Sequence, residues 1–375
     1  MSNKKQIILM AESSDIYHDG RVLKEAHALT EAGYDICIYG FRNFNFVKPT
    51  YPFQIKTLPV FNKKNRLARN LSLIFNILIF NFRILFKRAK VYHSHNTMFL
   101  PSMFLASKIY GAKLIYDCHE VQWELNILAR KIESAFIKKV KYIINVSEGR
   151  AKAQIERFDL KEDSLSIVSN FPEIPKRLTP ISFTNKKQLI FIFSGGFDLY
   201  DNKLDNFVRA LHDFKECRFI LMVFGYGDSY AKMEKIIKDI KIEDRVQFIP
   251  LVKPNEVIRT IEKFDIAVNL LTNPRNLISY KYHGINKVYE YLLAGLPILS
   301  SNLPSFINEF EGNNIGKSVD PDNIESIKEG IQYFLDHRSE LEEMKKRARA
   351  LAISKFNWDS EKYKLVELYK NLCVE

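Results

Sequence analysis

Residues 286–302 bring together residue types that can bind a nucleotide. Lys287 and Glu290 stand three positions apart, so they are neighbours on one face of an expected helix, near its start. A lysine there can hold a diphosphate, because a helix N-terminus already favours an anion. The carboxylate can accept hydrogen bonds from two ribose hydroxyls. A surface Lys–Glu pair is the alternative, and the Ala-Gly-x-Pro turn that follows makes it the weaker one.

Two glycines and a second lysine could take part in the same chemistry. Gly195 and Gly196 end an apolar run, and Lys203 stands near the start of the next expected helix, residues 202–214. Glycine lets the backbone approach a phosphate closely, and lysine supplies the positive charge that a departing diphosphate requires. The Gly-x-Gly turn at residues 225–227 is weak support by itself.

In the first half of the chain, His119 and Glu120 directly follow the apolar run 112–117. In a parallel sheet that position faces the ligand crevice, so a histidine there is a better candidate for a functional residue than a lone histidine elsewhere. His93 and His95 share one face of a strand, which would suit a metal, but no carboxylate stands near them at suitable spacing. We therefore expect no metal, and a structural or acceptor-binding role for this pair of histidines.

Asp19 and Arg21 stand at the start of the first expected helix, residues 21–32. Asp19 is equally well explained as a helix N-cap and as a substrate contact. Arg21 could bind an acceptor phosphate or lie in solvent, and the sequence favours neither.

These candidates depend on strands and helices that alternate along the chain. Short apolar runs typical of buried parallel strands occur at residues 6–11, 34–41, 53–60, 91–95, 112–117, 142–147, 164–170, 188–196, 218–227, 245–252, 265–271 and 296–302. Helical periodicity separates many of these runs, which predicts two doubly wound α/β sheets. Residues 170–187 contain three prolines and no helical period, so we expect the interdomain linker there. The predicted domains are 1–178, joined by a terminal helix at 356–375, and 179–355.

The 375-residue chain has a formal net charge of +12, so an anionic partner is expected. Residues 61–90 contain no Asp or Glu and have an apolar middle; their cations are Lys63, Lys64, Arg66, Arg69, Arg83, Lys87, Arg88 and Lys90. The middle, residues 71–86, is shorter than the roughly 20 residues that span a bilayer. A helix docked on anionic lipid and a buried crossover helix explain the segment equally well. We expect no nucleic-acid binding, because the phenylalanines here do not alternate with basic residues.

The sequence also indicates a cellular compartment. The four cysteines are widely separated and are interpreted as reduced thiols. The apolar residues near the N-terminus are too few for a signal-peptide core and suit a first buried strand. We therefore expect a cytoplasmic protein, peripheral on the inner face of the cell membrane.

The stretch around Lys287 resembles a motif of glycosyltransferase family 4, P-N-K-x-x-E-Y-x-x-A-G-x-P. The matching residues are Asn286, Lys287, Glu290, Tyr291, Ala294, Gly295 and Pro297. Other landmarks of the family follow in order over nearly the whole chain, including residues 19–34, 169–172 and 225–227. Two positions differ from many members, because Tyr282 replaces a glutamate and Gly196 replaces an arginine.

The resemblance implies a GT-B fold, with two facing Rossmann-like domains and a C-terminal helix that crosses back to the first. It implies catalytic roles for His119, Lys203, Lys287 and Glu290. It implies that the donor binds at Gly195, Gly196, Asn202, Gly225, Tyr226, Gly227, Leu251, Val252, Tyr282, Gly284, Asn286 and Val288. The acceptor is expected at Asp19, Arg21, His95 and Glu120.

The reaction implied by the resemblance is metal-independent transfer of a sugar, with retention of configuration, from a nucleotide diphosphate sugar. The expected acceptor is a glycan or lipid-linked glycan of cell-surface polysaccharide synthesis, such as lipopolysaccharide or capsule, and no cofactor beyond the donor is expected. One alternative is a nucleotide-sugar epimerase or hydrolase on the same fold. Another is a catalytically silent relative that binds lipid or a partner, which Tyr282 and Gly196 suggest.

Overall fold

The computed structural model describes residues 6–43, 49–60, 66–183, 188–196, 198–199, 201–223, 225–273, 275–282 and 286–374. The expected site residues Lys63, Lys64 and Gly284 lie outside these ranges. The chain forms two compact units: unit 1 is residues 1–170 with 361–375, and unit 2 is residues 171–360. The boundaries differ from those expected at 178 and 356, because Phe171 packs on Phe356 in the core of unit 2.

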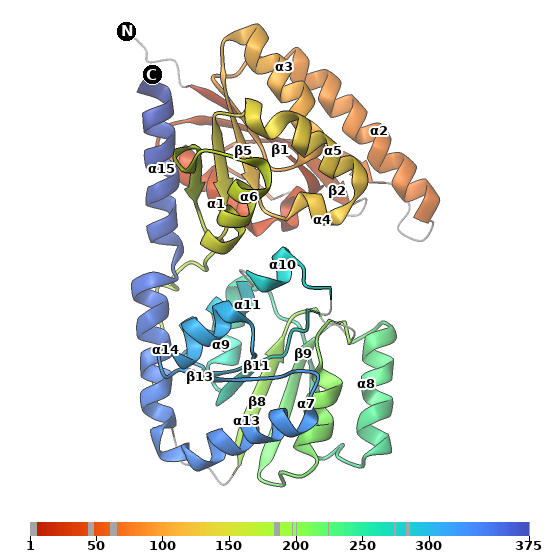
Figure 1. The fold of residues 1–375 in the computed structure, drawn as a ribbon, viewed down its shortest axis with the longest axis vertical. Coiled ribbons are helices and arrows are strands. Elements are labelled where there is room, and N and C mark those ends of the chain that lie inside the picture. Colours follow the sequence, from red (N-terminus) through yellow and green to blue (C-terminus); the bar gives the residue numbers. More distant parts are fainter. Residues whose placement is uncertain are drawn as a thin grey trace. The chain divides into compact units, whose positions relative to one another are not determined.

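Unit 1 is built on a parallel sheet of seven strands in the order β3-β2-β1-β4-β5-β6-β7 (Figure 1). The strands are β1 Ile7–Asp15, β2 Asp35–Asn43, β3 Gln54–Val60, β4 Val91–Ser94, β5 Lys113–Cys118, β6 Tyr142–Asn145 and β7 Leu165–Ile167. Most of them are apolar runs without alternation, because helices cover both faces of the sheet, whereas the edge strand β3 begins with exposed Gln54 and Lys56 on either side of buried Ile55.

The helices of unit 1 are α1 Gly20–Glu31, α2 Arg66–Leu85, α3 Leu100–Tyr110, α4 Gln122–Leu125, α5 Ile127–Phe136, α6 Glu148–Phe158 and, at the end of the chain, α15 Trp358–Val374. On one face of the sheet, Phe80 of α2 and Met103 of α3 pack with Tyr92. On the other face, the hydroxyl of Tyr369 in α15 lies 2.7 Å from Nδ1 of His93 in β4. Residues 361–375 thus complete unit 1, as expected for a returning C-terminal helix.

Unit 2 has a second parallel sheet, of six strands in the order β10-β9-β8-β11-β12-β13. Its strands are β8 Leu189–Ser194, β9 Cys217–Val223, β10 Val246–Pro250, β11 Ile266–Asn269, β12 Ile298–Ser301 and β13 Gly316–Val319. Its helices are α7 Leu204–Leu211, α8 Asp228–Asp239, α9 Val257–Ile261, α10 Ile278–Lys281, α11 Asn286–Leu293, α12 Pro304–Phe306, α13 Ile324–Asp336 and α14 Leu341–Lys355. Two α/β units with parallel sheets confirm the predicted fold class.

Two elements differ from the sequence expectations. β13 was not predicted from the sequence, because it is four residues long and includes a glycine and a lysine, so it does not form an apolar run. α2 is 20 residues long, and its part Leu67–Leu85 is long and apolar enough to cross a membrane by length and composition. The expectation that this segment is too short to span a bilayer is therefore wrong.

Candidate active site

The expected site residues of unit 1 lie where its strand order reverses. β1 has β2 on one side and β4 on the other, so the connections that leave β1 and β4 diverge at the carboxyl edge of the sheet. Doubly wound sheets bind ligands at this point. Asp19 and Arg21 follow β1, His95 follows β4 and His119 follows β5.

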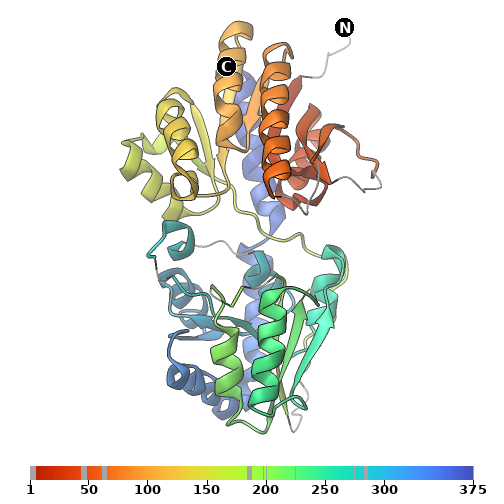
Figure 2. The ribbon, with the colours of Figure 1, turned by 90° about the vertical axis from the view of Figure 1, so that its right-hand side faces the viewer.

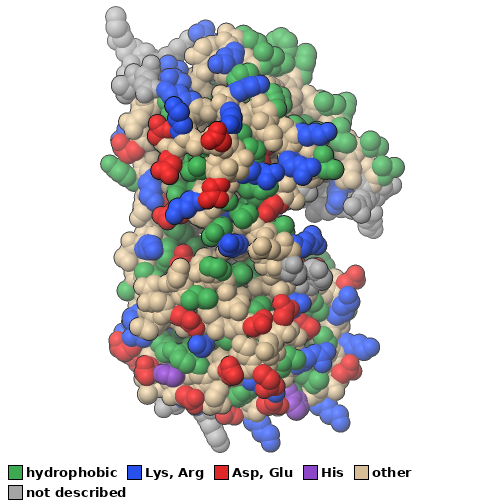
Figure 3. Space-filling model, in the orientation of Figure 1, with side chains coloured by type: hydrophobic (Ala, Val, Ile, Leu, Met, Phe, Trp, Pro, Cys, Tyr) green, Lys and Arg blue, Asp and Glu red, His purple; other side chains and the backbone are tan. Residues whose placement is uncertain are grey.

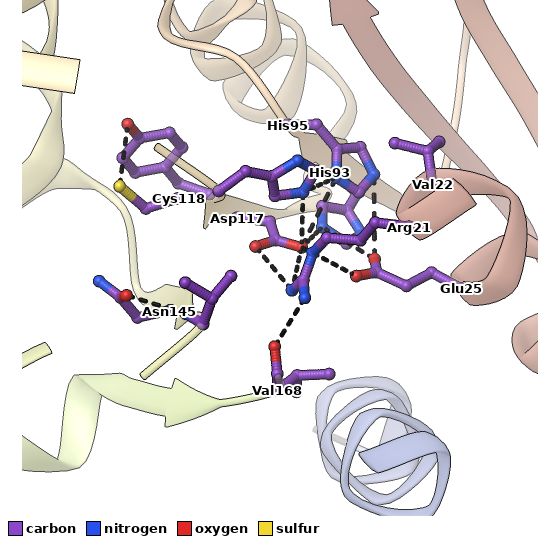
Figure 4. Close-up of polar contacts among 12 residues, drawn as sticks. Arg21, Val22, Glu25, His93, His95, Asp117, Cys118, Asn145 and Val168 are labelled. Carbon is purple, nitrogen blue, oxygen red and sulfur yellow. Dashed lines mark hydrogen bonds and ion pairs between the residues drawn. The ribbon is translucent and has the colours of Figure 1, made fainter. Parts of the chain in front are cut away.

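Arg21 is the centre of a buried ionic network (Figure 4). Its side chain is 4% exposed, and Nη2 donates to both carboxylate oxygens of Asp117, at 3.0 and 2.9 Å. Nη1 donates to the carbonyl of Val168 at 2.7 Å, and Nε lies 3.0 Å from Oε1 of Glu25. These partners offset the cost of burying a charge. Arg21 is therefore neither solvated nor open to an acceptor phosphate, which corrects both interpretations of it.

Asp117 also holds His119, whose Nε2 lies 3.2 Å from Asp117 Oδ2. Burial lowers the pKa of His119, but the charge and hydrogen bond of Asp117 outweigh burial and raise that pKa to about 9. Although burial would raise the pKa of Asp117, Arg21 and His119 hold it well below its usual range. The imidazole of His119 is therefore positively charged at neutral pH. The backbone carbonyl of His119 accepts a hydrogen bond from Arg150 Nη1 at 2.8 Å.

His93 and His95 are buried and neutral, because burial lowers both pKa values, that of His95 further than that of His93. Nδ1 of His95 lies 2.9 Å from Nε2 of His119. His95 is 1% exposed, so it lies behind His119 and its side chain does not reach an acceptor. The expected contact of His95 with an acceptor is therefore wrong, and the residue instead supports His119.

Two carboxylates accompany these histidines, contrary to the expectation from sequence spacing. Ligand atoms of Glu25, His93, His95 and Asp117 all lie within 4.8 Å of one another. Such a donor set suits a divalent cation. Here, however, the guanidinium of Arg21 pairs with both carboxylates and already supplies the positive charge between them. We therefore interpret the cluster as the support of Arg21 and His119. The reason given for expecting no metal, that no carboxylate stands near His93 and His95, was wrong.

The remaining acceptor candidates differ in environment. Asp19 caps α1, because its Oδ1 accepts from the backbone N–H of Val22 at 3.2 Å, as in the capping interpretation. The side chain of Glu120 is exposed. Glu12, which was not among the expected site residues, is a buried residue of β1 whose Oε1 accepts from Asn96 Nδ2 at 3.4 Å. Burial raises the pKa of Glu12 to about 7, although the charge of His119 opposes this. Its signal was present in the sequence, since Glu12 directly follows the first apolar run.

In unit 2, Lys287 of α11 reaches the end of β8. Its Nζ lies 4.0 Å from the ring centre of Phe193, and a Cβ added to Gly195 would lie 3.7 Å from Nζ. Gly195 has φ +114°, which favours glycine. Burial lowers the pKa of Lys287 to about 8, although the charge of Glu290 opposes this. An incompletely solvated ammonium beside an open backbone turn is well suited to bind a phosphate.

Tyr291 fixes α11 against β8. It is fully buried, and its hydroxyl accepts a hydrogen bond from the backbone N–H of Ser194 at 2.8 Å. Burial raises the pKa of Tyr291 well above its usual range, so the hydroxyl stays neutral. Lys287 and the partly buried Glu290 lie within the four residues that precede it in α11. The Tyr291–Ser194 hydrogen bond therefore holds α11, the helix that carries both residues, against the end of β8.

Lys203 has an acidic partner. Its Nζ lies 3.1 Å from Oδ1 of Asp322, and Thr272 Oγ1 donates to Oδ2 of the same carboxylate at 2.7 Å. The backbone N–H of Lys203 donates to the carbonyl of Leu270 at 2.9 Å, which places it beside the end of β11. A diphosphate at Lys203 would therefore share this ammonium with Asp322.

The other expected donor residues follow strand ends along one edge of the second sheet. Gly196 and Asn202 follow β8, Gly225, Tyr226 and Gly227 follow β9, Leu251 and Val252 follow β10, and Tyr282 and Asn286 lie between β11 and β12. Parallel strands end at a common edge, so positions that follow these strands belong to one side of the sheet. Val288 differs, because its side chain is 1% exposed in the core, and a donor could contact its backbone only.

Two family models match the chain. The one described as Glycosyltransferase Family 4 matches residues 21–172, and the one described as Glycosyl transferases group 1 matches residues 176–351. The chain belongs to glycosyltransferase family 4. This confirms the resemblance found around Lys287 and identifies this family 4 chain as a glycosyltransferase.

Two curated relatives resemble this family 4 chain. Chitobiosyldiphosphodolichol beta-mannosyltransferase of Kluyveromyces lactis is 21% identical, over 98% of this chain and 91% of its own length. Spore coat protein SA of Bacillus subtilis is 27% identical, over 53% of this chain and 45% of its own length. The match thus spans slightly less than half of the spore coat protein.

Solved structures resemble the family 4 chain over nearly its whole length. Sucrose-phosphate synthase from Thermosynechococcus elongatus has a TM-score of 0.76 at 15% identity, covering 99% of this chain and 100% of its own. Anabaena Alr3699/HepE, solved in complex with UDP and glucose, has a TM-score of 0.73 at 13% identity, covering 98% and 100%. At these identities the likeness establishes the fold, which is the predicted GT-B architecture.

Proposed function

We propose that this glycosyltransferase uses a nucleotide diphosphate sugar as donor and retains the configuration of the transferred sugar. The observation that carries the proposal is Lys287, whose ammonium lies beside the open turn at Gly195 in unit 2. The departing diphosphate is the group that such an ammonium stabilises, and Glu290 would hold the ribose. Alr3699/HepE, which shares the fold, was solved with UDP and glucose, which supports a nucleotide donor.

His119 takes a role that its charge determines. A protonated imidazole would repel a sugar cation, so its side chain suits a hydrogen bond to a sugar hydroxyl or to an oxygen of the leaving group. The carbonyl of His119 accepts a hydrogen bond from the guanidinium of Arg150 at 2.8 Å, so it too is poorly suited to a developing sugar cation. We therefore assign to His119 the hydrogen bond of its side chain alone.

We further propose a glycan or lipid-linked glycan of the cell surface as acceptor, and a cytoplasmic site of action without metal or additional cofactor. The K. lactis relative is named for a diphosphodolichol-linked acceptor, which supports a lipid-linked one here. Cys37, Cys118 and Cys217 are free and buried, which is consistent with a reducing compartment.

The test is a transfer assay with a panel of nucleotide sugars and lipid-linked acceptors, with the anomeric configuration of the product read by NMR. Lys287→Ala and Glu290→Ala should abolish transfer and donor binding. The control is the exposed pair Lys346 and Glu343 of α14, which has the same three-residue spacing at 2.8 Å. Lys346→Ala and Glu343→Ala should leave both activities intact.

The same assay separates the alternatives. A product with inverted configuration would refute retention. Donor consumption that no acceptor accelerates would favour a hydrolase or epimerase. Absence of donor binding across the panel would favour a silent relative, the alternative that the unusual Tyr282 and Gly196 suggest.

A further inference from the structure

Helix α2 has two apolar faces, and one of them is uncovered. Phe80 and Ile84 are fully buried in the core of unit 1. The opposite face carries large apolar side chains that are each at least 56% exposed: Leu67, Leu71, Ile74, Phe75, Leu78 and Phe82, followed after the helix by Phe86. At 3.6 residues per turn, the six within α2 fall in an arc of about 100°. They form a continuous stripe along one side of the helix.

Helix α3 extends this stripe. It lies beside α2 (Figures 1 and 2) and exposes Leu105 and Ile109, at 49% and 59%. Figure 3 shows apolar side chains gathered along the edge of unit 1 that α2 and α3 occupy. We call the exposed apolar side chains of α2, Phe86, Leu105 and Ile109 the α2/α3 ridge. Apolar patches of this kind mark interaction surfaces in water-soluble proteins.

The charged residues in the sequence around the ridge are all lysines and arginines. No Asp or Glu occurs between Asp35 and Asp117. This segment contains thirteen lysines and arginines, enough to account for the whole net charge of +12: Arg42, Lys48, Lys56, Lys63, Lys64, Arg66, Arg69, Arg83, Lys87, Arg88, Lys90, Lys108 and Lys113. Arg69, Arg83, Arg88, Lys90 and Lys108 are exposed on or beside α2 and α3. A surface that is apolar and basic complements an anionic lipid bilayer, which offers acyl chains beneath acidic headgroups. A second copy of this segment would instead bring like charges together.

We propose that the α2/α3 ridge docks unit 1 on an anionic bilayer, with α2 lying in the plane of the headgroups. The buried face of α2 argues against a spanning helix. Asn76 Nδ2 donates to the carbonyl of Pro59 at 3.0 Å, and Asn81 Nδ2 donates to that of Met98 at 3.2 Å. The ring of Phe80 stacks on that of Tyr39 at 5.1 Å. A helix crossing the bilayer would have to abandon all these contacts.

The test is sedimentation of the full-length protein with vesicles of phosphatidylcholine, with and without phosphatidylglycerol. The wild type should bind the anionic vesicles and bind neutral ones far more weakly. Leu78→Glu combined with Phe82→Glu should weaken binding at least about tenfold, because it places two anions in the ridge. Arg69→Gln and Arg83→Gln should each weaken it about fivefold. Tyr363→Glu is the control, because Tyr363 is 67% exposed on α15, away from the ridge. It should bind as the wild type does.

Several results would overturn the proposal. Equal binding to neutral vesicles, or unchanged binding by the Leu78→Glu, Phe82→Glu variant, would refute docking through the ridge. A wild-type dimer that this variant converts to a monomer would identify the ridge as an interface between copies. Resistance of the bound protein to alkaline carbonate extraction would indicate a spanning helix. The assay contains neither donor nor acceptor, so its failure would leave the proposed transferase activity untouched.

Discussion

The pKa of Lys287 makes donor binding depend on pH in a specific way. Burial lowers this pKa to about 8, so the side chain is mostly charged at pH 7 and mostly neutral at pH 9. A diphosphate placed beside it favours the charged form and raises the pKa of the bound state. Binding above pH 7 must therefore take up a proton. With a free pKa of about 8, donor affinity should be about tenfold weaker at pH 9 than at pH 7, or about 1.4 kcal/mol.

Isothermal titration calorimetry measures this proton uptake directly. A nucleotide diphosphate sugar is the suitable ligand, because its diphosphate does not titrate between pH 7 and 9. Titrations in buffers of different ionisation enthalpy should give an uptake of about half a proton per donor at pH 8, close to one at pH 9, and little at pH 7. Lys287→Arg keeps the charge without the titration, so its affinity should be independent of pH over this range.

Two results would refute this reasoning. Zero proton uptake at pH 8 by the wild type would mean that Lys287 does not meet the diphosphate. An equally steep pH dependence in Lys287→Arg would assign the titration to another group.

Two further predictions concern the buried network of unit 1. Asp117→Asn should lower the pKa of His119 from about 9, because burial and the charge of Arg21 are then opposed only by the weaker attraction of Glu12. NMR titration of the imidazole would show this, and an unchanged pKa would contradict the pairing. The pKa of His119 is higher in the folded protein than in the unfolded chain, where it is about 6.5. This difference stabilises the fold fully at pH values below about 6.5, and the stabilisation is lost as pH rises through about 9. Glu12→Gln should raise the melting temperature more at pH 8 than at pH 5. The buried carboxyl of Glu12 keeps its proton up to about pH 7, and above that pH its ionisation destabilises the fold by about 3 kcal/mol, a cost that glutamine does not have. An equal shift at both pH values would contradict the raised pKa.

The sequence predicts the parts of the site that are local. Lys287 and Glu290 share one helix turn, and Gly195 directly follows a strand, so spacing and position along the chain are enough to predict where these elements place them. Their neighbours along the sheet edge are predictable for the same reason, because the carboxyl ends of parallel strands share an edge.

The network around Arg21 is not local, and the expectations drawn from sequence spacing were wrong for it. Glu25 belongs to α1, His93 to β4 and Asp117 to β5, and these elements meet only when the sheet forms. The spacing of residues along the sequence therefore did not reveal that His93 and His95 have carboxylates beside them. The same limit applies to α2, whose buried and exposed faces are both apolar, so its pattern alone does not distinguish a core helix from a docking helix.

The most direct test of the proposed donor site is a crystal structure of the protein with a bound nucleotide diphosphate sugar. We expect diphosphate oxygens within hydrogen-bonding distance of Lys287 Nζ and of the backbone at Gly195, with the ribose hydroxyls on Glu290. A nucleotide bound elsewhere on unit 2, with Lys287 still resting on Phe193 and contacting no phosphate, would contradict the proposed site.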